Sequence, residues 1–131
     1  MTTTALRYIV IGTLLALLAI RCFYLFYSPF ALELFALFFA YTACVYLGAA
    51  LSDSRTVWLS VEFALSLVFF TFAALGLVRD PAWLAVGFIL HGIWDMLHHP
   101  AAAIKTKVVK WFPPLCAVFD FVVAAYLLAF F

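Results

Sequence analysis

Five apolar segments dominate the sequence, and each is about as long as a helix that crosses a lipid bilayer. They comprise residues 6–26, 29–51, 57–78, 81–99 and 113–131. A helix needs about 20 apolar residues to span the hydrocarbon core, whereas a membrane β-barrel shows alternating strands of about ten residues. The sequence therefore predicts an all-α integral membrane bundle of five transmembrane helices in a single domain, with four helices plus an interfacial segment as the alternative.

The composition excludes an ordinary soluble domain. Hydrophobic residues make up 70% of the chain and charged residues 10%, while soluble domains carry about 25% charged residues. A net charge of +1 without any basic run argues against a nucleic-acid partner. Membrane lipid is therefore the expected partner, and a second copy of the chain or another membrane protein could also contact it.

Proline and short polar side chains mark where the helices should begin. Ser28-Pro29 and Asp80-Pro81 each place a capping residue before a proline in the first helical position. Residues 101–112 mix lysines with apolar and aromatic residues, a pattern that favours an interfacial segment.

The distribution of basic residues predicts the orientation in the membrane. With five spans, one side carries most of the basic residues: Arg7, Arg55, Lys105, Lys107 and Lys110. The other side carries only Arg21 and Arg79. Because cytoplasmic loops are enriched in Lys and Arg, we expect the N-terminus in the cytoplasm and the C-terminus outside, in a bacterial inner membrane.

Ionisable residues inside the spans need a partner or a purpose, because each costs roughly 2.5–3.5 kcal/mol at membrane depth. Arg21 and Glu33 flank the short connection between the first two spans. Paired charges are the least costly arrangement in lipid, so the sequence predicts a structural ion pair between them.

A cluster of candidate metal ligands lies in the fourth span. His91, Asp95 and His98 fall on one narrow helical face because they are four and seven residues apart, and His99 lies at its edge. Neutral imidazole and carboxylate are good ligands for zinc, iron or manganese. We therefore expect these four residues to bind a transition metal, Zn or Fe, with Asp95 alternatively orienting a ligating imidazole.

Two further acids should approach this face from neighbouring helices. Glu62 lies about six residues into the third span, and Asp120 about seven residues beyond Pro113. Both share helical faces with small residues, where membrane helices pack closely. The sequence predicts that Glu62, Asp95 and Asp120 lie at similar depth and are the candidate catalytic carboxylates.

The segment from Asp95 to His99 resembles the HxxHH boxes of membrane fatty-acid desaturases and hydroxylases, with Asp95 in place of the first histidine. Those enzymes carry more histidines than the three of this chain. The set of Asp and His residues is also similar to that of membrane hydrolases related to alkaline ceramidases, and the block from His91 to His99 resembles small bacterial membrane proteins. Together these resemblances imply no single activity.

The remaining apolar residues leave the location of a ligand open. The many phenylalanines could line a pocket for a lipid, a retinoid or an isoprenoid, or could only face lipid and fill the bundle. A chain this short is expected to open any ligand site to lipid or to share it between protomers. Cys22, Cys44 and Cys116 are interpreted as reduced, buried packing residues.

Three functions are compatible with these features. The first is a metal-dependent enzyme that acts on a lipid-soluble substrate. The second is a proton- or ion-coupled transport component that uses the same residues as a relay. The third is a structural or accessory subunit of a membrane complex, in which the ionisable residues only fix helix packing.

Overall fold

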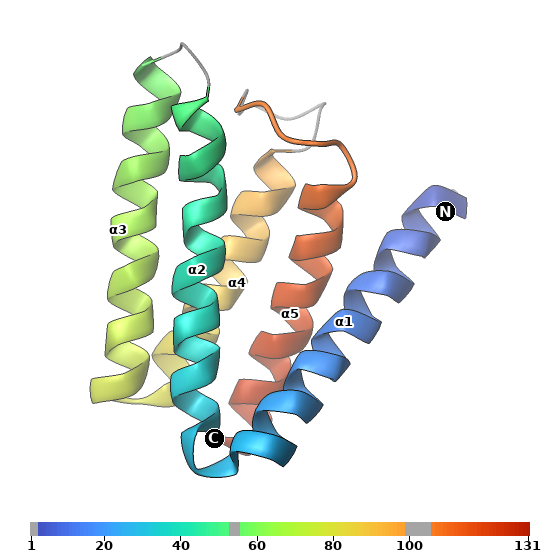
Figure 1. The fold of residues 1–131 in the computed structure, drawn as a ribbon, viewed down its shortest axis with the longest axis vertical. Helices are drawn as coiled ribbons and strands as arrows, with labels where there is room; N and C mark the ends of the chain where they lie inside the picture. Colours follow the sequence, from blue (N-terminus) through green and yellow to red (C-terminus); the bar gives the residue numbers. More distant parts are fainter. Residues whose placement is uncertain (1–2, 53–55, 99–105) are drawn as a thin grey trace.

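The computed structural model describes residues 3–52, 56–98 and 106–131. Their elements, in chain order, are α1 (Thr3–Tyr27), the short 3-10 helix η1 (Ser28–Phe30), α2 (Ala31–Leu51), α3 (Thr56–Val78), α4 (Pro81–Leu97) and α5 (Phe112–Phe130). Successive α-helices run in opposite directions, so that the two termini lie at opposite ends of the bundle (Figure 1). The predicted all-α bundle of five helices is confirmed.

The chain is a multi-pass membrane protein by the length and composition of its helices. Four helices, α1, α2, α3 and α5, are long and apolar enough to cross a bilayer. The remaining helix, α4, is a shorter apolar helix of 17 residues, which corresponds to a length of about 26 Å along its axis. Large apolar side chains such as Leu18, Leu37 and Val57 are exposed by 60% or more, as expected for a surface that faces lipid.

The predicted starts of the second and fourth spans have different outcomes. The Asp80 side chain accepts a hydrogen bond from the backbone N–H of Ala82 at 2.8 Å, and Pro81 opens α4, so this prediction is confirmed. The Ser28 prediction is wrong. Ser28 lies in η1, and α2 begins after Phe30 without a side-chain cap, because the tight 3-10 turn makes the reversal between α1 and α2.

The predicted interfacial segment is described only in its second part. Residues 99–105 lie outside the described residues, and residues 106–109 are irregular before the chain turns into α5. Within this part, Val109 and Trp111 are more than half exposed, whereas Thr106 is buried. The segment therefore presents apolar and aromatic side chains outward and inserts one hydroxyl into the bundle.

Close approach of α4 to α5 positions the polar residues of both helices. A Cβ atom at Gly92 would lie 3.1 Å from ring atoms of Phe121 and 3.3 Å from the carbonyl oxygen of Ala117. Glycine at this position lets the two backbones come together, as small residues do in membrane bundles. The preceding residue of α4, His91, is thereby brought to Asp120 on α5.

Candidate functional site

The buried polar residues of the described chain gather in one half of the bundle. They are Tyr46 together with Glu62, Ser66, His91, Asp95, His98, Thr106 and Asp120. This half of the bundle holds the C-terminal ends of α2 and α4 and the N-terminal ends of α3 and α5 (Figure 1). The similar depth of the acids in a membrane stays a prediction, and these buried acids and histidines form two clusters, both of which contact Tyr46.

The first cluster joins α4 to α5. The Nδ1 atom of His91 lies 2.7 Å from Oδ2 of Asp120 and 3.7 Å from Oδ2 of Asp95. All three side chains are at least 97% buried. One ligand atom from each of the three lies within 4.8 Å of the other two, so this cluster could hold a metal ion.

Among the residues that the structure describes, two buried atoms of this cluster find no hydrogen-bond partner: Nε2 of His91 and Oδ2 of Asp95. Buried polar atoms are almost always paired in folded proteins, so unpaired ones require an explanation. When Nδ1 carries the hydrogen that bonds Asp120, Nε2 holds a free lone pair. Both unpaired atoms are then electron donors, which is the property of a ligand-binding group.

Tyr46 on α2 completes the cluster and was not predicted. Its hydroxyl donates a hydrogen bond of 2.5 Å to Oδ1 of Asp95, which leaves Oδ2 of Asp95 on the side of His91. Its ring also stacks on His98 at a centroid distance of 3.8 Å. The sequence feature that could have indicated Tyr46 is its position within an apolar span, because a buried phenol usually requires a hydrogen-bond acceptor.

The second cluster surrounds Glu62 on α3. Its Oε1 atom lies 2.8 Å from Nε2 of His98 and accepts a 2.7 Å hydrogen bond from the Thr106 hydroxyl. Its Oε2 atom accepts a 3.1 Å bond from the indole N–H of Trp94. The carboxylate thus has three donors from two other parts of the chain, and it holds the 106–111 segment against α3 and α4.

The structure divides the predicted metal ligands. His91 and Asp95 lie in the first cluster with Asp120, but His98 binds Glu62 and the carbonyl oxygen of Trp94. The shared helical face was predicted correctly, but seven residues correspond to about 10 Å along the helix axis, which is too far for one ion. Glu62 is likewise outside the His91 cluster, and His99 lies outside the described residues.

The ion pairs of the described residues do not include the predicted pair between Arg21 and Glu33. Both side chains are exposed. Arg21 lies in a surface groove with Tyr126 and Phe130 of α5, because its position on α1 directs it to that helix and away from α2. The prediction of a structural pair is therefore corrected.

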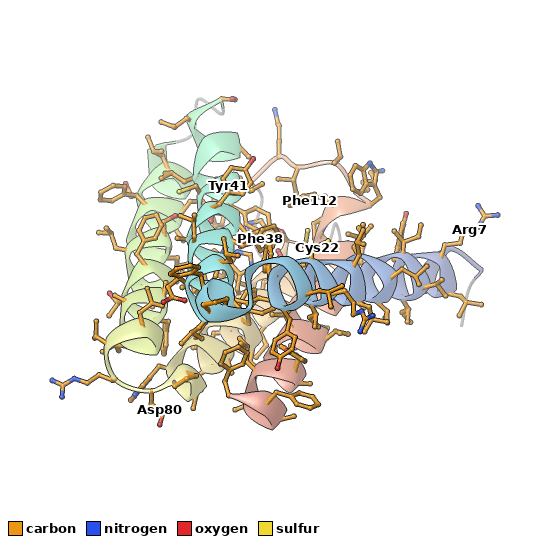
Figure 2. The ribbon with its side chains drawn as sticks, turned by 60° about the horizontal axis from the view of Figure 1, so that its bottom comes forward. Arg7, Cys22, Phe38, Tyr41, Asp80 and Phe112 are labelled. Carbon is orange, nitrogen blue, oxygen red and sulfur yellow. The ribbon has the colours of Figure 1, made fainter. Side chains whose placement is uncertain are left out.

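An apolar cavity of about 650 Å³ leads from the surface to the first cluster. It lies between α1, α2 and α5, and both His91 and Asp120 contribute to its lining. Figure 2 shows Cys22 of α1 near Phe38 and Tyr41 of α2, three of the residues that line it. The polar cluster is thus accessible from an apolar space rather than sealed in the core.

The cysteine prediction requires a correction at the same place. All three thiols are free, as predicted, but Cys44 is exposed, and Cys22 and Cys116 are only partly buried. The latter two line the cavity. Their incomplete burial follows from the open space between α1 and α5.

Comparison with known proteins assigns the chain to a family. A model described as "Family of unknown function (DUF6010)" matches residues 7–130. The chain is therefore a member of the DUF6010 family. In this member, four helices are long and apolar enough to cross a membrane, and the bundle contains a buried His/Asp cluster. No curated protein and no solved structure matches the chain.

Proposed function

We propose that this protein is a small membrane enzyme that uses a divalent transition metal to act on a lipid-soluble substrate. The metal is held by His91, Asp95 and Asp120. The observation that carries the proposal is that two members of this cluster, His91 and Asp120, line a cavity whose walls are mostly apolar. Intramembrane ionisable groups that face a cavity are functional in most cases.

The charges of the cluster favour a divalent cation. Asp95 and Asp120 are 0% and 2% exposed, and the ion pairs within the described residues give them no Lys or Arg partner. Buried carboxylates are very costly unless they are paired, protonated or bound to a metal. Two carboxylates and one neutral imidazole balance the charge of Zn²⁺, Fe²⁺ or Mn²⁺, all of which accept such ligands.

The spacing of the donor atoms supports the same proposal. Ligand atoms about 2.0–2.2 Å from one metal lie roughly 3–3.5 Å from each other. With a metal bound, Nδ1 of His91 would be the ligating nitrogen, and Nε2 would carry the single hydrogen of the neutral imidazole. The distances from Nδ1 to the two carboxylates, 2.7 and 3.7 Å, bracket that separation. The hydroxyl of Tyr46 fixes Asp95 from behind, as hydrogen bonds to ligating groups commonly do.

Three protein ligands leave a coordination position for water, which is the arrangement of catalytic sites. A metal held by these residues would supply a water activated as a nucleophile at neutral pH. Attack of this water on an ester carbonyl carbon of the substrate would form a C–O bond, break the ester C–O bond and release an acid and an alcohol, so the reaction would be a hydrolysis with water as the only co-reactant. The substrate reaches the metal through the cavity between α1, α2 and α5.

A transport relay has less support, because no buried polar residue of the described chain continues from His91 toward the opposite end of the bundle. The rings of Phe39, Phe69 and Phe88 pack together on that side. Two of them contact the His91 imidazole edge to face. A proton path would have to pass through this aromatic layer.

Metal analysis of protein purified without chelators tests the proposal. The wild-type protein is expected to contain about one equivalent of Zn, Fe or Mn by mass spectrometry. Asp95→Asn and Asp120→Asn should lose it, whereas Glu33→Gln, which changes an exposed carboxylate, should keep it. A wild-type protein that remains folded and metal-free after incubation with these ions would leave only a structural role for the cluster.

A further inference from the structure

We propose that the cavity binds a neutral lipid with a single apolar chain, and that the uncharged polar end of this lipid points toward His91 and Asp120. The inference rests on the proposed function and names its substrate class. It is carried by three properties of the cavity: its opening, its size and the chemistry of its inner end.

The cavity opens toward the membrane at the middle of the first two spans. Leu15 and Leu18 of α1 and Tyr41 of α2 line it and are 43%, 60% and 71% exposed. These residues lie well inside the apolar spans 5–25 and 31–51. Figure 2 shows α1 directed away from α2 beyond their shared turn, with Cys22, Phe38 and Tyr41 on this side. A ligand therefore enters laterally from lipid.

The size of the cavity fits one apolar chain. Its volume of about 650 Å³ lies within the range of roughly 300–1,000 Å³ for sites of drug-sized ligands. The walls are formed by aliphatic and aromatic side chains, including Leu115 and Phe119 of α5. A two-chain phospholipid would have to leave one chain outside.

The inner end of the cavity determines the class of the polar group. His91 and Asp120 are the ionisable groups there apart from the phenol of Tyr41 and two thiols, and no Lys or Arg of the described residues lines the cavity. Phosphate and carboxylate are recognised by Arg or Lys forks and point charges, which are missing from this lining. An anionic headgroup would therefore lie beside Asp120 with no cationic side chain of the lining to neutralise it.

Uncharged oxygen groups suit this end of the cavity with or without a bound metal. A hydroxyl or ester oxygen can occupy the open coordination position of a metal, and it can accept a hydrogen bond from Nε2 of His91 when that atom carries the hydrogen. A hydroxyl can also donate to Nε2 when that atom is unprotonated, and Nε2 has no partner among the described residues. Thr42 also lines the cavity and offers a further hydroxyl in the wall. An alkylglycerol ether presents such groups on one chain and has no ester bond to be cleaved.

Photocrosslinking in lipid nanodiscs tests this inference with the full-length protein. The probe is a long-chain alkylglycerol ether that carries a diazirine in its chain, and labelled peptides are identified by mass spectrometry. Competitors of equal chain length are an unlabelled alkylglycerol, a fatty acid, a lysophosphatidic acid and a long-chain amine. Bound metal is measured on the same samples.

Two variants fill the cavity from α1. Ala19→Phe adds a ring at a partly buried lining position, and Leu18→Trp enlarges a residue that is 60% exposed, so its fold is less at risk. The control is Ala74→Phe, the same change at an exposed position of α3 that is not part of the lining. Because each larger side chain would overlap with the bound lipid chain, the affinity of both filling variants for the probe should fall by about tenfold or more.

The expected result is labelling of α1, α2 and α5 peptides that alkylglycerol displaces, that both filling variants reduce by about tenfold, and that Ala74→Phe leaves unchanged. Equal displacement by the fatty acid, the lysophosphatidic acid or the amine would overturn the assignment to a neutral lipid. Labelling that Leu18→Trp leaves unchanged would overturn the location. If the wild-type protein contains its metal but is not labelled, the lipid inference fails while the proposed metal site stands. If the wild-type protein is labelled but contains no metal, the proposed metal site fails instead.

Discussion

Substitution of Tyr46 by Phe tests whether Asp95 is held in place for a ligand. The change removes one hydroxyl and keeps the ring that stacks on His98. It deletes the hydrogen bond to Oδ1 of Asp95, the bond that fixes this carboxyl group from α2.

The magnitude follows from the burial of the pair. Tyr46 and Asp95 are 1% and 0% exposed, so water cannot replace the lost donor. Hydrogen bonds to charged groups contribute about 1.5–3 kcal/mol, and removal of an outer partner of a metal ligand weakens metal binding about 10- to 100-fold. We expect both effects in Tyr46→Phe, with the metal effect measured as a change in Kd.

The assay compares Tyr46→Phe with Tyr24→Phe, which makes the same change at a tyrosine of α1 that is 53% exposed. The free energy of unfolding is measured in mixed micelles, and the metal Kd by competition with a chelating dye. A double-mutant cycle with Asp95→Asn isolates the coupling of the pair. A coupling energy near zero, or a metal Kd equal to that of Tyr24→Phe, would refute the reasoning.

Two further predictions concern the surroundings of the site. Glu62→Ala should lower the free energy of unfolding by about 3–5 kcal/mol because it leaves buried donors without their shared acceptor. The variant should keep the metal. Loss of the metal with unchanged stability would place Glu62 among the metal ligands instead. Gly92→Leu should cost about 1–3 kcal/mol through its clash with the Phe121 ring and should lower metal content, whereas Gly48→Leu, with nothing within 4 Å of its Cβ position, should do neither. Equal unfolding free energies of the two glycine variants would contradict the close packing of α4 on α5.

The helices were predictable because lipid imposes their length and their apolar composition. The ends of the predicted spans lie within a few residues of the structural helices, and the Asp80 cap was readable because its sequence follows a local rule. The 3-10 turn at Ser28 could not be predicted from the same rule. The same kind of sequence forms a 3-10 turn there, since the reversal of the chain between α1 and α2 overrides the local preference for a cap.

The site was predictable in part because helical periodicity and depth are local properties. They placed Asp120 toward the His91 face correctly, and the 2.7 Å contact between these side chains confirms this approach. They could not separate His98 from His91, because residues on one face can still lie two helical turns apart. The contributions of Tyr46 and Thr106 depend on contacts between distant segments, which a single sequence does not reveal.

Metal-edge X-ray absorption of the purified wild-type protein shows directly whether His91 ligates a metal. We expect a Zn, Fe or Mn ion with nitrogen and oxygen ligands at about 2.0–2.2 Å, with an imidazole signature that disappears in His91→Ala and persists in His98→Ala. A metal with sulfur ligands, or an imidazole signature that depends on His98 and not on His91, would contradict this expectation.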